Sequence, residues 1–215
     1  MIHRDKNGFT LVELMIAVTV FSVLLILSAA SLTQISRLYY KAVIATKTQN
    51  VSRTIMNDIA QAFQFSSGNM TNVGVPDGNG LRRICIGNVR YTYALNKQIN
   101  SSNKHALWRD KVASSGSCDA LNIYDNSEIA NSAASAGGTE LLESGMRLKS
   151  ISIGGNNLIP EIKNINIAVI YGDDDLINFS DSAKTQPVDC KGGVTGSQWC
   201  AFSRLYTQVF SRVKS

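Results

Sequence analysis

One carboxylate, Glu13, stands near the start of a long apolar run, and residues 14–36 after it contain no charged side chain. An ionisable group in lipid costs on the order of 2.5 kcal/mol or more, so it indicates a function and needs a proton or a cationic partner. If the chain were cut after Gly8, the new α-amino group of Phe9 would lie about one helical turn before Glu13. The same amine on a neighbouring chain would supply the missing cation.

The other residues with reactive side chains are sparse. The chain has four cysteines and two histidines: Cys85, Cys118, Cys190, Cys200, His3 and His105. No C-x-x-C pair occurs, so a zinc site is poorly supported. An even cysteine count in an exported chain favours disulfides, and four cysteines allow three pairings. Loop closure favours the local pairs, Cys85 with Cys118 and Cys190 with Cys200.

Asp173, Asp174 and Asp175 form the one acidic cluster. Carboxylates are ligands that suit Ca²⁺, which makes the cluster a weak calcium candidate, but the spacing is not that of an EF-hand. A solvated turn after a strand is the alternative interpretation and the favoured one. No nucleophile-elbow, phosphate-loop or dinucleotide-binding pattern occurs. We expect His105 in an exposed loop or at a strand edge, and we expect neither an enzyme nor a cofactor.

Charge is spread thinly over the 215 residues, since 17% are charged and the net charge is +5. Lys and Arg are scattered, and the most basic short stretch is Arg82-Arg83 with Arg90 nearby. A basic balance is compatible with nucleic acid, but no basic run or recognition motif supports that partner. Solvated surface charge is the favoured interpretation.

The N-terminal segment has the composition of a membrane-inserted helix. Residues 1–8 are polar and include Arg4 and Lys6, which the positive-inside rule keeps on the cytoplasmic side. Residues 14–36 would extend about 35 Å as a helix, enough to cross a hydrocarbon core of about 30 Å. A conventional signal peptide cut near Ala30 is one alternative, although the run is too long and contains Glu13. An uncleaved signal anchor is the other.

The sequence around the proposed cut resembles a known signal. The residues that carry the resemblance are Gly8-Phe9-Thr10-Leu11-Val12-Glu13-Leu14. They resemble the class III signal of type IV prepilins and of type II secretion pseudopilins. The resemblance implies cleavage after Gly8 by a prepilin peptidase, N-methylation of Phe9, and a role for Glu13 in meeting the N-terminal amine of an adjacent subunit. It also implies other pilins or pseudopilins as partners of the N-terminal helix.

The resemblance further implies a location and a class of subunit. The chain is expected in the bacterial inner membrane before assembly and in a pilus or pseudopilus afterwards. Many major pilins have a proline inside the helix, whereas this chain has Ala30 and no proline before Pro76. Together with its length, this favours a minor pilin or pseudopilin that supports filament initiation or tip assembly. A pilus-tip adhesin or DNA-binding module is the alternative, followed by a membrane-anchored enzyme.

The hydrophobic pattern predicts a pilin-like α+β fold with four parts. These are a leader (1–8), a membrane and assembly half of a helix (9–36), its amphipathic half (37–68) and a β-rich head (69–215). Apolar or small residues recur at three- and four-residue steps through Ile44, Val51 and Ile59, and Gly68 is a candidate C-cap. The predicted strands, which form an antiparallel sheet packed on the helix, are 81–86, 89–95, 121–124, 146–153, 162–171 and 202–213.

Overall fold

The computed structural model describes residues 9–66, 70–73, 80–112, 118, 138–155, 162–193 and 195–212. The chain divides after Tyr40 into two compact units. Helix α1 (Leu11–Phe65) contributes its first part to one unit and its second part to the other. The predicted long helix is therefore confirmed, while the predicted C-cap Gly68 lies outside the described residues.

The second part of α1 presents one buried face to the head. Its buried residues recur at three- and four-residue steps: Ile44, Thr48, Val51, Ser52, Ile55, Met56, Ile59 and Phe63. Two of them are polar, and each donates its hydroxyl proton to a carbonyl one turn earlier: Thr48 to Ile44 and Ser52 to Thr48. Their burial therefore leaves no unpaired hydroxyl in the core.

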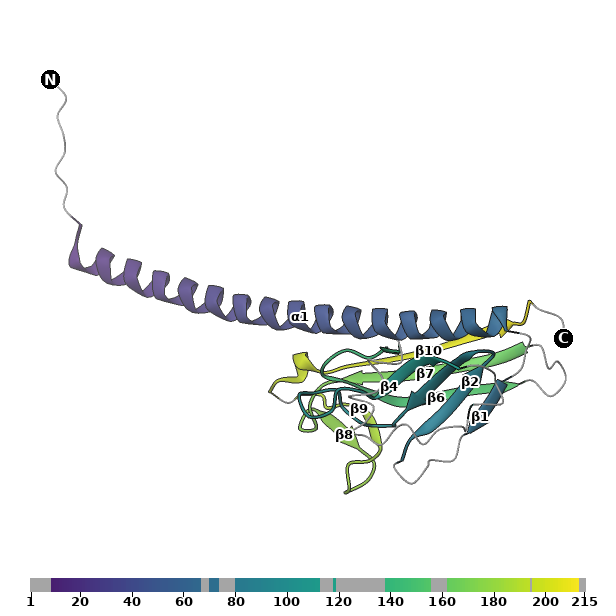
Figure 1. Cartoon of the computed structure of the whole chain (residues 1–215). Helices are drawn as coiled ribbons and strands as arrows, with labels where there is room; N and C mark the ends of the chain where they lie inside the picture. Colours follow the sequence, from purple (N-terminus) through teal and green to yellow (C-terminus); the bar gives the residue numbers. More distant parts are fainter. Residues whose placement is uncertain are drawn as a thin grey trace. The chain divides into compact units, whose positions relative to one another are not determined.

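Five strands form the first antiparallel sheet (Figure 1). They lie in chain order: β1 (Met70–Val73), β2 (Arg82–Ile86), β3 (Val89–Tyr93), β4 (Leu107–Lys111) and β5 (Thr139–Glu140). Gly87 and Asn88 form the predicted turn between β2 and β3, and Gly87 adopts a φ of 60°. β3 ends at Tyr93 rather than at the predicted Leu95. The predicted strand 121–124 lies outside the described residues.

Three longer strands form the second antiparallel sheet in the order β10–β7–β6. They are β6 (Met146–Gly155), β7 (Ile162–Tyr171) and β10 (Ala201–Phe210). The period-two face predicted for β7 is confirmed, because Ile165, Ile167 and Val169 are fully buried. β10 ends before the predicted residue 213, since the Arg212 amide N–H donates to the Gln64 carbonyl at the end of the helix.

A small hairpin lies between Gly172 and Gln198, where the sequence pattern predicted no strand and therefore a loop. It consists of β8 (Ile177–Phe179) and β9 (Pro187–Cys190), and a 3-10 turn (Ser197–Trp199) follows. The loop prediction was therefore wrong in this segment. The strands are too short for a period-two pattern to stand out, and they are held by packing of Ile177 and Leu176 against Ile170.

One hydrophobic core joins the helix to both large sheets. It includes Ile55 and Ile59 from α1, Tyr91 from β3, and Leu148 and Ile167 from β6 and β7. Figure 1 shows the second part of α1 running along the sheets. The structure is thus α+β, with one long helix and antiparallel sheets, as the sequence predicted.

Candidate functional site

Helix α1 begins with a capping box built from Thr10 and Glu13. The Thr10 amide N–H and hydroxyl both donate to Glu13 Oε2, at 2.9 and 2.8 Å, and the Glu13 amide N–H lies 3.3 Å from Thr10 Oγ1. These contacts satisfy backbone donors that have no partner inside the helix. The sequence reasoning missed this role of Glu13, although the T-x-x-E spacing before an apolar run signals it.

The predicted cleavage site lies directly before this cap. Phe9 is 83% exposed and precedes the first helical residue, while Gly8 lies outside the described residues. A cut between them would place a new amine next to the capping box.

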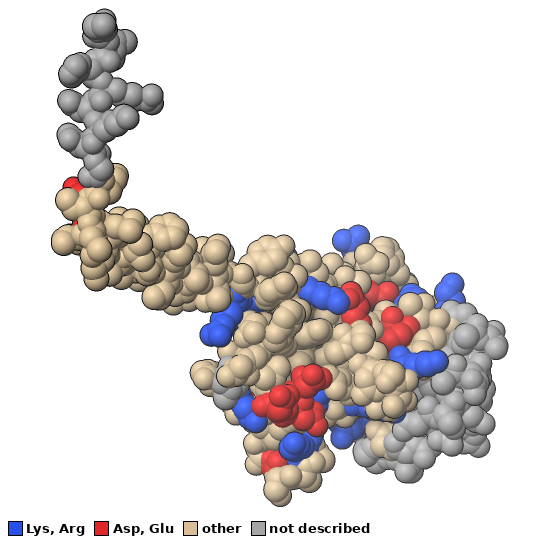
Figure 2. Space-filling view, turned by 90° about the vertical axis from the view of Figure 1, so that its left-hand side faces the viewer, with Lys and Arg blue, Asp and Glu red and all other residues tan. Residues whose placement is uncertain are grey.

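The first unit exposes an uncharged apolar surface. Large apolar side chains of residues 11–27 are more than half exposed, including Leu14, Phe21 and Ile26. Residues 14–36 contain no Lys, Arg, Asp or Glu, and Figure 2 shows a tan stretch of the helix next to a red acidic group at its start. The stretch is long and apolar enough to cross a membrane, and none of it is buried within the chain.

Six hydroxyl side chains within this surface are satisfied by the helix itself. Each of six hydroxyls donates to a carbonyl three or four residues earlier: Thr19, Ser22, Ser28, Ser31, Thr33 and Ser36. No water is needed to pair them, so the helix can be surrounded by lipid or by other apolar helices. Small hydroxyl residues also let neighbouring helices approach closely.

Two polar contacts fix the second part of α1 to the first sheet. Asp58 Oδ2 accepts a hydrogen bond of 2.7 Å from the Tyr91 hydroxyl and lies 2.9 Å from Arg109 Nε. Outside that sheet, Lys47 Nζ lies 2.7 Å from Oε2 of Glu143, which follows β5. The head is thereby held to a defined register of the helix.

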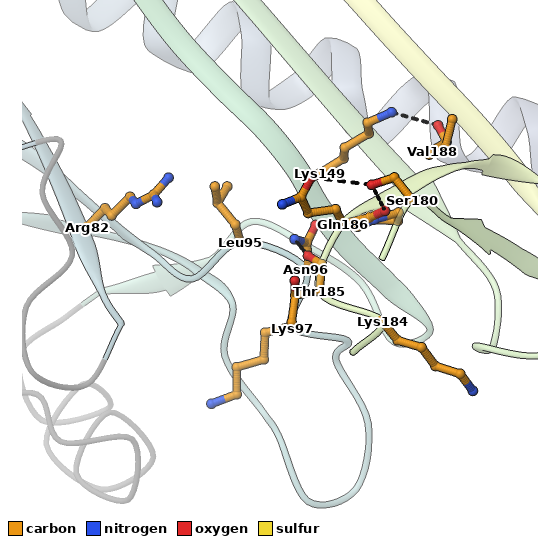
Figure 3. A pocket seen from close by; sticks show the side chains of 11 residues that line it. Arg82, Leu95, Asn96, Lys97, Lys149, Ser180, Lys184, Thr185, Gln186 and Val188 are labelled. Carbon is orange, nitrogen blue, oxygen red and sulfur yellow. Dashed lines mark hydrogen bonds between the residues drawn. The ribbon is translucent and has the colours of Figure 1, made fainter. Parts of the chain in front are cut away.

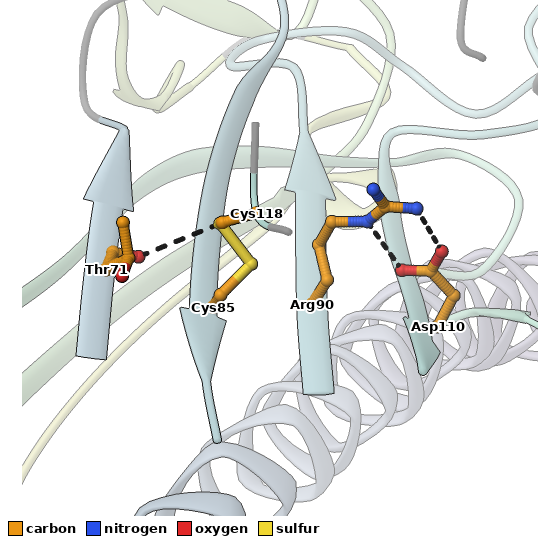
Figure 4. The surroundings of a disulfide bond; sticks show 5 residues. All are labelled: Thr71, Cys85, Arg90, Asp110 and Cys118. Atoms are coloured by element: carbon orange, nitrogen blue, oxygen red, sulfur yellow. Dashed lines mark hydrogen bonds and ion pairs between the residues drawn. A yellow bond between two sulfur atoms is a disulfide. The ribbon is translucent and has the colours of Figure 1, made fainter. Parts of the chain in front are cut away.

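The four cysteines form two disulfides, and these are the local pairs favoured by the sequence. Cys85 in β2 bonds to Cys118, and Cys190 at the end of β9 bonds to Cys200 just before β10. Figure 4 shows the first bridge beside the ion pair between Arg90 in β3 and Asp110 in β4. This ion pair is bidentate, and both of its side chains are buried. The disulfide therefore holds β2 to the segment at Cys118, and the ion pair holds β3 to β4.

The acidic cluster after β7 is occupied by side chains of the protein. Arg147 Nη1 lies 2.7 Å from Asp174 Oδ1, and Arg147 Nη2 donates to the Gly172 carbonyl at 3.1 Å. Gln98 Nε2 donates to Asp173 Oδ1 at 2.9 Å. Within the part of the chain that the structure describes, no group of three or more acidic, His or Cys residues is arranged to hold a metal ion. The Arg147 guanidinium therefore supplies positive charge at the cluster that the sequence suggested as a weak calcium candidate.

His105 lies just before β4 and is half-buried rather than exposed. Its ring packs edge-on against Trp108, with 4.6 Å between ring centroids, and its Nδ1 lies 3.4 Å from Glu140 Oε2. Burial lowers the pKa of His105, and Lys104 and Lys97 add to this effect. Glu140 accepts backbone N–H bonds from Ala106, Leu107 and Leu142. The pair thus closes the end of the first sheet, a role that no local pattern predicted.

Comparison with known proteins identifies the N-terminal segment. A family model described as the Prokaryotic N-terminal methylation motif matches residues 3–29. No curated protein and no solved structure matches the chain. The motif implies cleavage by a prepilin peptidase, anchoring in a membrane, and assembly with other pilins. Together with the long apolar helix and the antiparallel head, the matched motif supports a type IV pilin-like protein with a class III signal.

Proposed function

We propose that the chain is a minor pilin or pseudopilin, a structural rather than catalytic subunit that helps to initiate a filament or to form its tip. The observation that supports this most directly is that the two parts of α1 have different surroundings. Its first part exposes an apolar surface in which six Ser and Thr hydroxyls are satisfied by the helix backbone, whereas its second part buries one face against its own head. The first part of α1 holds such a subunit in the bacterial inner membrane before assembly. On assembly, the same part packs among the helices of other subunits.

The absence of a helix-breaking proline supports the minor class. Pro76 is the first proline of the chain, and α1 is continuous from Leu11 to Phe65. Such a helix has no built-in site at which to kink or melt when it is packed into a filament. We therefore expect few copies at an end of the filament rather than many along it.

Glu13 would act during this transfer. In the single chain its carboxylate is satisfied by Thr10, so the charge is partly compensated at the helix end. On assembly, the methylated amine of Phe9 on a neighbouring subunit would offer a full positive charge. Removal of both groups from water strengthens their attraction, which favours correct axial register of the incoming subunit.

Three variants separate an assembly role of Glu13 from a purely capping role. Glu13→Gln keeps an oxygen that can accept the Thr10 hydrogen bonds but loses the charge. Thr10→Ala removes the hydroxyl of the cap and keeps the charge. Each variant, with Glu13→Ala, would be expressed in the native host, and the amounts in membranes and in sheared filaments would be measured by immunoblot.

We expect all three variants to be processed to a chain beginning with N-methylated Phe9, as shown by mass spectrometry. Glu13→Gln and Glu13→Ala should remain in the membrane, whereas Thr10→Ala should enter filaments. Equal incorporation of Glu13→Gln and the natural chain would contradict the charge-pairing role. A natural chain that is processed but never found with filament subunits would contradict the proposed function itself.

A second candidate, a tip adhesin or DNA-binding module, is favoured by one observation: a polar cleft with several cationic side chains on the head. It uses the same route of export and assembly, so the two functions are compatible.

A further inference from the structure

Two cavities on the head meet at Arg82 in β2. The larger has a volume of about 800 Å³ and lies between the 95–97 segment, β6 and the β8–β9 hairpin. The smaller has a volume of about 400 Å³ and is lined by the outward side of β6, β7 and β10 together with Tyr93. Arg82 lines both, so we treat them as one surface and call it the Arg82 cleft.

Cationic residues from four different segments of the chain line the larger cavity, and one of them, Lys149, donates to the Val188 carbonyl at 2.6 Å. Arg82 lies on β2, Lys97 follows β3, Lys149 lies on β6 and Lys184 lies in the β8–β9 turn (Figure 3). None of the described residues that line either cavity is acidic. The acidic side chain of the turn, Asp181, is engaged by the Thr185 and Gln186 backbone N–H groups. The cleft therefore suits a ligand that carries several negative charges.

Neutral polar groups outnumber the cations in the lining. Amide and hydroxyl side chains come from both cavities, and they include Asn96, Thr185, Gln186, Ser152, Asn164 and Asn166. Each of these groups can donate and accept hydrogen bonds. A matching ligand must therefore offer donors and acceptors in addition to its negative charge.

One exposed aromatic ring completes the surface. Tyr206 on β10 lines the smaller cavity and is 61% exposed, whereas Tyr93, the other aromatic residue there, is buried. Tyr206 lies beside Asn166 of β7 in the strand register, so an aromatic face and an amide are neighbours. An exposed tyrosine offers a flat apolar face with a polar edge.

We propose that the Arg82 cleft binds an acidic polysaccharide, with uronate or sulfate groups on the cations and sugar hydroxyls on the amides. A pyranose ring presents a flat C–H face that can lie on Tyr206. A nucleic-acid backbone fits less well, because phosphates only accept hydrogen bonds and leave the amide oxygens unmatched. Sites for single strands also stack successive bases on several aromatic rings, and here a single exposed ring lines the described part of the cleft.

The test is a binding measurement on the full mature chain in detergent micelles. The probes are an oligogalacturonate of about ten sugars, a neutral dextran of similar length, and a 20-nucleotide DNA in single- and double-stranded form. Isothermal titration calorimetry should detect binding of the oligogalacturonate that weakens as salt is raised, with no binding of dextran. Tighter binding of either DNA than of the oligogalacturonate, or equal binding of dextran, would overturn the assignment, as would the absence of any binding.

Variants locate the binding on this surface. Arg82→Gln with Lys97→Gln should weaken binding by about tenfold or more, since each removes a charge-assisted contact. The matched control, Lys104→Gln with Lys111→Gln, removes the same charge from exposed lysines outside both cavities and should leave affinity within about twofold. Tyr206→Ala should weaken binding, and Tyr206→Phe should retain it. An equal loss in the control pair would overturn the proposed site.

The outcome is independent of the proposed function as a filament subunit. Variants of the Arg82 cleft should still enter sheared filaments, because they leave α1 intact. If Arg82→Gln lowers stability, the Tyr206→Ala and Tyr206→Phe variants still test the site, because Tyr206 is exposed. Circular dichroism and thermal unfolding of each variant establish that the head is folded.

Discussion

The Tyr91 hydroxyl donates a 2.7 Å hydrogen bond to Asp58, which joins the centre of β3 to the second part of α1. Burial raises the pKa of Tyr91, and the contact with Asp58 adds to this shift. Arg109 Nε lies 2.9 Å from the same carboxylate oxygen, so Asp58 is the centre of a three-residue contact between helix and sheet. The head is therefore fastened to its helix by polar groups as well as by the core.

Asp58→Ala should destabilise the head by about 1–3 kcal/mol, because the buried Tyr91 hydroxyl loses its acceptor. In a Tyr91→Phe background the same substitution should cost clearly less. Guanidinium unfolding of the mature chain in detergent, followed by tryptophan fluorescence, gives the double-mutant cycle. Effects that add to within about 0.5 kcal/mol would show that Asp58 and Tyr91 are not coupled.

Because Arg147 pairs with the acidic cluster, the stability of the loop after β7 should not depend on calcium. The Arg147 side chain is only 3% exposed and pairs with Asp174, so Asp174→Asn leaves a buried positive charge without its carboxylate and should cost about 1–3 kcal/mol. Asp175→Asn is the matched control, since only the Asp175 main-chain carbonyl is bound there, by Lys191. Thermal unfolding with calcium or with a chelator should give the same midpoint for the natural chain. A midpoint raised by calcium would instead support a metal site at the acidic cluster.

The two disulfides should differ in their contribution to stability. Cys85–Cys118 closes a loop with a sequence separation of 33, against 10 for Cys190–Cys200. Loop-closure entropy then predicts about 4 kcal/mol for the first bridge and about 3 kcal/mol for the second. Paired Cys→Ser variants, compared by denaturant unfolding, test the order. A larger loss from Cys190→Ser with Cys200→Ser would mean that local packing, rather than loop length, decides the difference.

Glu140 should make stability depend on pH near neutrality. Burial raises the pKa of Glu140 from 4.5 to about 7, against the opposing effect of its backbone hydrogen bonds. Because the folded-state pKa is the higher one, this contribution to stability is fully present below about pH 4.5 and is lost as pH rises through about 7. The loss over that interval is on the order of 3 kcal/mol.

The measurement compares Glu140 with Glu140→Gln, both in a His105→Gln background that removes the imidazole titration. The free energy of unfolding is determined at several pH values from about 4.5 to 8. The advantage of the Glu140 chain should shrink as pH rises. A difference that stays constant would show that the three backbone donors hold the pKa of Glu140 near its ordinary value.

Much of the architecture was predictable because it depends on local periodicity. The uncharged run after Glu13, the buried steps of α1 from Ile44, and the alternation that buries Ile165 and Ile167 are all properties of neighbouring residues. Local disulfide pairs were favoured for the same reason, since short loops cost the least entropy to close. The capping box of Thr10 and Glu13 was also readable from its spacing, although the sequence reasoning did not use it.

The N-terminal signal, the long helix and the α+β class follow from the amino-acid pattern alone. The tertiary structure alone decided how the strands divide into two large sheets and a hairpin, which carboxylates meet Arg90, Arg147 and Tyr91, and where Arg82 and Tyr206 line a common cleft. Hydrophobic period fixes which face of an element is buried, because side-chain direction repeats along a helix or strand. Contacts between distant side chains follow from strand order and register, which the period of one segment does not specify.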